Sequence, residues 1–226
     1  MKKYYSIAID GPAGAGKSTI AKKVAKDLGF IYVDTGAMYR AMALYFIRNN
    51  ISAKDQESIE KACKDVKIVI EYIDGEQGVI LNGENVNGLI RTEEVGNMAS
   101  ASSVYPVVRM KLVELQQELA KTENVIMDGR DIGTYVLPNA DLKIYLTAST
   151  KERAKRRWLE LKNKGIDADI TAVEKDIIER DQRDMTREFA PLKQAEDAIL
   201  VDSSNLTIEE VVDRIKEYFN NIKGLI

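Results

Sequence analysis

Short apolar runs and longer helical patterns take turns along this chain. Tyr4–Ile9 is typical of a buried strand, and Ile20, Val24 and Leu28 then recur at the spacing of one helix face. The spacing of apolar residues along the chain predicts strands at Tyr4–Ile9, Phe30–Val33, Val125–Met127, Leu142–Leu146 and Ile199–Val201. It predicts helices at Lys17–Leu28, Ala37–Arg48, Asn97–Lys121, Lys151–Lys162, Thr171–Thr186 and Thr207–Ile222. Strands that alternate with helices predict an α/β fold with a parallel five-stranded sheet flanked by helices on both faces.

About residues 50–96 depart from this alternation. Apolar and polar residues alternate at Val66–Tyr72, at Gly78–Leu81 and near Val86, around Asp74-Gly75 and Asn82-Gly83. Because Asn-Gly is a strong hairpin signal, we predict a small antiparallel meander inserted between the second and third core strands. Such an insertion can simply cover the surface, or it can close over a second substrate and expel water.

The loop after the first predicted strand matches a phosphate-binding pattern. Gly11 to Ser18 fit G-x-x-x-x-G-K-[ST] at every fixed position, between a predicted strand and a predicted helix. Successive backbone N–H groups can surround a phosphate there, Lys17 can reach the β- and γ-phosphates, and the Ser18 hydroxyl can help to hold Mg²⁺. We therefore predict a site for a nucleoside triphosphate, formed by Gly11, Pro12, Ala13, Gly14, Ala15, Gly16, Lys17, Ser18 and Thr19. The alternative is a glycine-rich turn that only joins strand to helix.

The composition limits the type of reaction that the chain can catalyse and the compartment in which we expect it. The 226 residues carry a net charge of −3, which gives no general attraction to nucleic acid or to an anionic membrane. The longest wholly apolar run, Ala41–Ile47, is too short to span a bilayer, so we expect a cytoplasmic protein. Cys63 is the one cysteine, which excludes an intrachain disulfide, and histidine is absent. Without imidazole, the reaction best suited to the remaining groups is phosphoryl transfer, which depends on positioning and charge stabilisation.

Three loops should meet at one edge of the sheet. The phosphate loop, Asp34-Thr35-Gly36 and Asp128-Gly129-Arg130-Asp131 each follow a predicted strand, and parallel sheets bind ligands beyond the carboxyl ends of their strands. Arg130 in such a loop favours phosphate binding. Asp128 is either a carboxylate that orders water on Mg²⁺ or a buried cap of local backbone.

Further arginines cluster on two predicted helices. Their spacing places Arg153, Arg156 and Arg157 on one face, and Arg180, Arg183 and Arg187 on another. The first cluster can equally be a solvated surface, and Arg180 with Asp184 can equally be a surface ion pair.

The chain resembles the bacterial cytidylate kinases, a branch of the nucleoside monophosphate kinases. The resemblance covers nearly the whole chain. The segments that carry it are Ile9–Ser18, Asp34–Arg40, Ile90-Arg91-Thr92, Asp128–Thr134, Glu152-Arg153-Ala154, Glu179-Arg180-Asp181 and Ala190-Pro191-Leu192. It implies phosphorylation of CMP and dCMP by ATP with Mg²⁺, in a protein that acts as a monomer.

The resemblance also implies a division of labour among residues. Arg40, Arg130 and Arg187 are expected to hold the acceptor phosphate, with Thr35, Tyr39, Arg180 and Asp184 on the sugar and Ser100, Arg109 and Asp131 on the base. Lys17, Arg130, Arg153, Arg157 and Arg187 are the expected catalytic cations, and Ser18 the Mg²⁺ ligand, with Asp128 acting through water. It implies one kinase domain with a core at 1–35, 97–150 and 188–226, a monophosphate-binding segment at 36–96 and a helical lid at 151–187.

Two other functions compete with this one. A kinase of a small-metabolite hydroxyl would share the phosphate loop and sheet, with Asp34 or Asp128 managing the hydroxyl proton. A GTP-dependent switch usually carries Asn-Lys-x-Asp, whereas Asn163-Lys164-Gly165-Ile166 lacks the aspartate at its fourth position.

Overall fold

A five-stranded parallel sheet forms the centre of the fold, as the alternating pattern predicted. The computed structural model describes residues 4–73 and 76–224. The strand order is β2-β6-β1-β7-β8. The strands are β1 (Ser6–Asp10), β2 (Ile31–Asp34), β6 (Val125–Gly129), β7 (Leu142–Thr147) and β8 (Ile199–Asp202). Each observed strand overlaps its predicted counterpart.

The chain divides into two compact units. The first unit combines Met1–Tyr32 with Glu123–Ile226, and the second unit is Val33–Thr122. The first boundary falls inside β2, so that Ile31 and Tyr32 belong to the first unit. The expected assignment of core, monophosphate-binding segment and lid is a functional one and stays a prediction.

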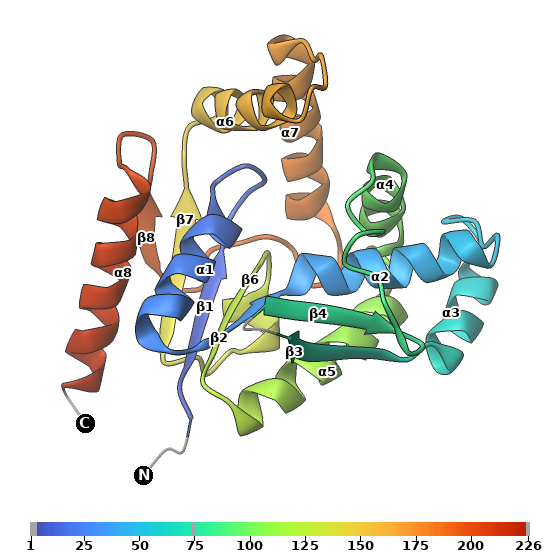
Figure 1. Ribbon diagram of the computed structural model, residues 1–226, viewed down its shortest axis with the longest axis horizontal. Helices are drawn as coiled ribbons and strands as arrows, with labels where there is room; N and C mark the ends of the chain where they lie inside the picture. The colour runs from blue at the N-terminus through green and yellow to red at the C-terminus, as the bar shows by residue number, and fades with distance from the viewer. Residues whose placement is uncertain (1–3, 74–75, 225–226) are drawn as a thin grey trace. The chain divides into compact units, whose positions relative to one another are not determined.

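The core of the first unit lies between the sheet and two of its helices. α1 (Lys17–Leu28) and α8 (Ile208–Lys223) bury their apolar faces against the strands (Figure 1). The fully buried residues of this cluster include Ile7 and Ile9 of β1, Val24 of α1 and Ile215 of α8. Ile7 and Ile9 share one face of β1, and Ala8 between them, which points to the other face, is also fully buried. Both faces of β1 are therefore buried, as expected of a central parallel strand. α6 (Thr150–Asn163) and α7 (Ile170–Thr186) pack through a separate small cluster of Ala154, Val173 and Ile177.

A single turn of π-helix was not predicted. It follows β6 and covers Ile132–Val136 (η1). Five residues are too few to display a periodic pattern, so sequence periodicity could not have detected it.

The second unit contains the predicted meander. Its strands are β3 (Ile68–Ile73), β4 (Glu76–Leu81) and β5 (Glu84–Asn85), paired in antiparallel order. Asn82 and Gly83 both have positive φ angles, 49° and 91°, which is the backbone that an Asn-Gly hairpin turn requires. The other predicted turn, Asp74-Gly75, lies outside the described residues.

In the second unit, one predicted helix was wrong and one helix was not predicted. In place of one helix at Asn97–Lys121 there are two, α4 (Glu93–Ser102) and α5 (Pro106–Thr122). Pro106 lacks a backbone N–H and would clash with a preceding turn, so it begins a helix instead of continuing one. α3 (Gln56–Asp65) was missed, although Asp55 caps its start and Ile59, Ala62 and Cys63 are buried at helical spacing. α2 (Thr35–Arg48) matches its prediction closely.

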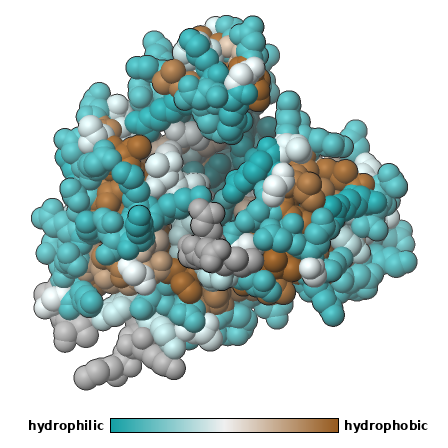
Figure 2. Space-filling model, in the orientation of Figure 1, coloured by the Kyte–Doolittle hydropathy of each residue, from teal (hydrophilic) through white to brown (hydrophobic). Residues whose placement is uncertain are grey.

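The surface is largely hydrophilic in the view of Figure 2, with scattered apolar residues. Ile170, Ile178 and Met185 of α7 are among the exposed large apolar side chains. Within the two described ranges, no helix combines the length and the apolar character needed to cross a membrane.

Candidate functional site

The phosphate loop joins β1 to α1 with a backbone that glycine makes possible. Gly11, Gly14 and Gly16 have φ angles of 151°, 74° and 87°. A Cβ atom on Gly11 would lie 1.9 Å from the carbonyl oxygen of Leu146 on β7, so no side chain fits at this position. The close packing of loop and strand therefore explains the first fixed glycine of the pattern.

Lys17 is buried at the start of α1. Its Nζ donates a hydrogen bond to the carbonyl oxygen of Pro12 at 2.8 Å. Burial lowers the pKa of Lys17 well below its usual range, and the positive charge of Arg130 lowers it further, against the opposing effect of Asp128. A bound phosphate next to Lys17 and Arg130 would stabilise the charged form of Lys17 against both burial and the repulsion from Arg130. The two cations are therefore suited to binding phosphate.

Asp128 lies at the end of β6 and contacts the phosphate loop. One carboxylate oxygen accepts from the Ser18 hydroxyl at 2.9 Å, and the other accepts from the Tyr32 hydroxyl at 2.8 Å. A hydroxyl beside a carboxylate is a hard oxygen donor set, which fits Mg²⁺. Tyr32 was not predicted, because a tyrosine inside a predicted strand carries no separate signal of function.

The two arginines of α6 that were predicted to be catalytic have different environments. The Arg153 side chain is only 7% exposed, and its guanidinium donates to the carbonyl oxygens of Ala148 and Ala13 and to Asp181. The Arg157 side chain is 46% exposed and pairs with Glu160 on the same helix at 2.8 Å. Arg153 therefore holds the phosphate loop in place, and both catalytic roles stay predictions.

The predicted acceptor-binding residues of the first unit form one charged cluster. Arg130 Nε lies 2.8 Å from Asp184, and Arg187 lies 3.6 Å from Asp131 and 3.8 Å from Asp184. Burial alone would lower the pKa of Arg130, but the charge and hydrogen bond of Asp184, together with the charges of Asp128 and Asp181, raise it overall. Burial would raise the pKa of Asp184, but the charge and hydrogen bond of Arg130, together with the charges of neighbouring arginines, lower it overall. Arg180 is exposed, one turn before Asp184 on α7, and its charge acts in the same direction.

Asp10 belongs to this cluster and was not predicted. Its carboxylate accepts hydrogen bonds from the backbone N–H groups of Ile132 and Gly133 at 2.8 and 2.7 Å. Burial raises the pKa of Asp10 to about 6 despite these two bonds, which act in the opposite direction. Its position directly after a predicted buried strand was the one feature of the sequence that could have indicated this role.

In the second unit, Asp34 organises the start of α2. Its side chain accepts from the backbone N–H of Ala37 at 2.9 Å and from Arg91 at 2.6 Å. Its own N–H donates to the side-chain oxygen of Gln77 on β4 at 2.6 Å. Thr35, which was predicted to bind the sugar, is the buried first residue of the helix that these contacts fix. The contacts of Gln77 and Arg91 were not predicted.

The other predicted residues of the second unit are held by backbone oxygens and by an aromatic ring. Arg40 donates to the carbonyl oxygens of Ile90 and Thr92, at 3.2 and 3.4 Å. Arg109 is buried, donates to the Ser103 carbonyl at 3.2 Å and lies 5.4 Å from the centre of the Tyr39 ring. The Ser103 hydroxyl in turn donates to the Ser100 carbonyl. Arg109 is thus in contact with the Tyr39 ring and is connected to Ser100 through Ser103.

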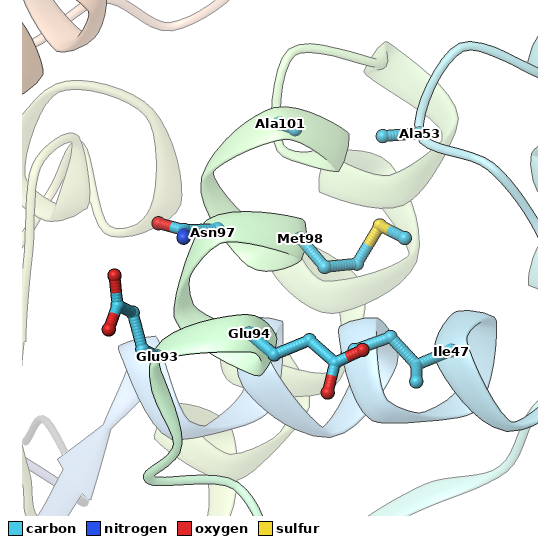
Figure 3. Close-up of a pocket in the computed structure, with 7 residues that line it drawn as sticks. All are labelled: Ile47, Ala53, Glu93, Glu94, Asn97, Met98 and Ala101. Atoms are coloured by element: carbon cyan, nitrogen blue, oxygen red, sulfur yellow. The ribbon is translucent and has the colours of Figure 1, made fainter.

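The second unit also contains a cavity of about 650 Å³ (Figure 3). Ile47 and Ala53 line one part of it, and five residues of α4 line another. The acidic side chains Glu93 and Glu94 lie at the first turn of α4. Among the described residues that line this cavity, none was predicted to bind a nucleotide.

The phosphate loop, the parallel sheet and the buried cations define a P-loop kinase. The family model described as cytidylate kinase matches residues 7–221, and the chain therefore belongs to the cytidylate kinase family. It is 57% identical to the cytidylate kinase of Caldicellulosiruptor bescii over 222 residues, 98% of both chains. It is 52% identical to that of Desulfitobacterium hafniense, over 98% of this chain and 95% of the relative. The predicted family is confirmed.

Solved structures of distant sequence support the fold. The shikimate kinase of Bacteroides thetaiotaomicron aligns with a TM-score of 0.50 at 15% identity, over 96% of this chain and 98% of its own. An uncharacterized protein from Eubacterium ventriosum aligns with a TM-score of 0.54 at 14% identity, over the same shares. At these identities, the likeness speaks for the architecture alone.

Proposed function

We propose that this protein transfers the γ-phosphoryl group of ATP to CMP and dCMP, with Mg²⁺, to form the diphosphates. The observation that carries the proposal is the family match over residues 7–221, which includes both the phosphate loop and the loop of Arg130. The competing assignment, a kinase of a hydroxyl acceptor, is not favoured, because the curated relatives at 46–57% identity are named cytidylate kinase.

The acceptor needs no general base. The second pKa of a phosphate ester is about 6, so a nucleoside monophosphate is largely dianionic at pH 7 and its oxygen can attack directly. This agrees with a chain that contains no histidine. What limits the reaction is the repulsion between two polyanions, which fixed cations can offset while they align the reactants.

Each group of cations has a proposed task. Residues Gly11–Thr19 bind ATP, with Lys17 on its β- and γ-phosphates. Ser18 holds Mg²⁺, which neutralises charge on the phosphates, and Asp128 orders its water. Arg40, Arg130 and Arg187 bind the acceptor phosphate, and Arg153 and Arg157 act from the helical lid at 151–187.

Recognition of the nucleoside is divided between sugar and base. Thr35, Tyr39, Arg180 and Asp184 bind the sugar, and Ser100, Arg109 and Asp131 bind the base. Cytosine offers an exocyclic amino donor to a carboxylate such as that of Asp131, whereas uracil has a carbonyl acceptor at that place. An unpaired buried acceptor discriminates strongly, so CMP is preferred to UMP. The protein acts as a cytoplasmic monomer.

A coupled assay of ADP formation tests the proposal. The purified protein is incubated with ATP, Mg²⁺ and, in turn, CMP, dCMP, UMP, AMP, GMP and a panel of hydroxyl acceptors. We expect rapid ADP formation with CMP and dCMP, and its loss in Lys17→Ala. Rapid ADP formation that needs a hydroxyl acceptor and not CMP would overturn the assignment.

A further inference from the structure

The first turn of η1 has no cap of its own. Asp131 occupies its N-cap position, but its side chain makes no capping hydrogen bond. The first N–H groups of any helix lack partners within the helix, and buried N–H groups need partners from elsewhere. Here Asp10, 122 positions earlier in the chain, supplies the partner for Ile132 and with its second oxygen the partner for Gly133.

The local packing is built around this contact. Asp10 is only 5% exposed. A Cβ atom on Gly133 would lie 3.4 Å from the Asp10 carboxylate and 3.1 Å from Cδ of Lys143, so glycine permits the close approach. Asp10 is also paired in register with Gly129 on β6 and with Tyr145 on β7. Its backbone is therefore fixed by strands on both sides.

Asp10 connects two loops that the proposed function uses. Its next residue along the chain is Gly11, the first of the phosphate loop, and its side chain holds the two residues that follow Asp131. We propose that Asp10 is a positioning residue that fixes the Arg130–Asp131 loop against the phosphate loop. This inference rests on the proposed function, because Arg130 and Asp131 are assigned there to the acceptor's phosphate and base.

The role predicts a particular kinetic pattern. When a positioning contact is lost, the loop that it held becomes misaligned, and a displacement of about 1 Å can cost about 100-fold in rate. We expect kcat/KM for CMP to fall by about 10- to 100-fold in Asp10→Ala, with a smaller fall in Asp10→Asn, whose single oxygen keeps one of the two bonds. The preference for CMP over UMP should fall as well, because Asp131 loses its position. KM for ATP should change by less than about twofold.

The Asn variant guards against simple misfolding. Burial already raises the pKa of Asp10 to about 6, so the surroundings accept a neutral side chain of the same shape. Asp141→Asn is the matched control, because Asp141 also accepts a long-range backbone bond, from Ser6 at 2.8 Å, at the opposite end of β1. It should leave both the CMP kinetics and the base preference unchanged.

The experiment combines kinetics with hydrogen exchange. Steady-state constants for CMP, UMP and ATP are measured for the wild type, Asp10→Asn, Asp10→Ala and Asp141→Asn, and amide exchange is followed in peptides that cover 130–136. Faster exchange there and a selective loss toward CMP in the Asp10 variants support the inference. Unchanged exchange, unchanged CMP kinetics, or an equal loss toward ATP and CMP would overturn it. A wild type that forms no ADP with CMP would instead overturn the proposed function, and the exchange result still decides whether Asp10 orders the loop.

Discussion

Arg153 and Asp181 together hold the peptide of Ala13 in the phosphate loop. Arg153 Nη1 lies 2.5 Å from Asp181 Oδ2 and donates to the carbonyl oxygen of Ala13 at 2.8 Å. The N–H of Ala13 donates to the other oxygen of Asp181 at 3.0 Å. Two buried side chains from α6 and α7 thus bind both polar groups of a single loop residue.

Arg153 and Asp181 should contribute to stability as a coupled pair. Arg153→Ala leaves Asp181 as a buried, uncompensated charge, which costs about 3–5 kcal/mol of stability. In Arg153→Ala/Asp181→Ala no lone charge remains, so the loss should be smaller than the sum of the two single losses. Urea unfolding of the two single variants and the double variant measures this coupling. Additive losses would mean that the two side chains act independently.

Gly11→Ala should destabilise the protein severely. Its Cβ would lie 1.9 Å from the carbonyl oxygen of Leu146, a backbone atom that can move only if β7 moves. Displacing a strand in a packed sheet should cost more than about 3 kcal/mol, within the range of severe core substitutions. The free energy of unfolding is measured with urea.

Gly29→Ala separates this clash from strain in the backbone. Gly29 also has a positive φ of 67°, but a Cβ there would meet no atom within 4 Å. Its cost should be about 1–2 kcal/mol, which is the penalty of a left-handed conformation alone. Similar losses for both alanine variants would contradict the steric explanation for Gly11.

Stability should depend on pH through Asp10. Its pKa is raised from 3.8 to about 6, chiefly by burial and also by the charge of Asp131, against the effect of Lys17. Because the folded state binds this proton more tightly than the unfolded state, the contribution to stability is present below pH 3.8 and is lost as the pH rises through about 6. The difference of roughly two pKa units corresponds to about 3 kcal/mol.

Asp10→Asn isolates this effect. The stability of the wild type minus that of Asp10→Asn should decrease between about pH 4 and pH 7 and then level off. Unfolding curves of both proteins across this range provide the measurement, and other carboxylates cancel in the difference. A difference that stayed constant with pH would show that Asp10 titrates as it does in the unfolded chain.

Asp131 should determine the choice of base. If it accepts from the cytosine amino group, Asp131→Ala lowers the ratio of kcat/KM for CMP to that for UMP by at least about tenfold. Asp131→Asn should lower the ratio mainly through a gain toward UMP, since its amide can donate to the uracil carbonyl while its oxygen can still accept from the cytosine amino group. Steady-state kinetics with CMP and UMP measure this ratio. If Asp131→Ala leaves the ratio unchanged, Asp131 does not bind the base.

The regular elements were predictable because their causes are local. Helix α1 was predicted to the residue, since an apolar stripe, a preceding glycine and a following glycine mark it. The helix predicted over Asn97–Lys121 was wrong, because its apolar spacing continues across Pro106 although the backbone cannot. Periodicity reports which face is buried, and it does not report where a chain must break.

The sequence by itself determined the family, the sheet and the phosphate loop, because each depends on residues that are close together in the chain. Only the tertiary structure decided which partners the charged residues have. It buried Arg153 against Asp181 while it left Arg157 on the surface, although both lie on one helix. It also placed Asp10 against a turn 122 residues away. Partners so distant in sequence are brought together by packing of the whole sheet, and no local pattern encodes that contact.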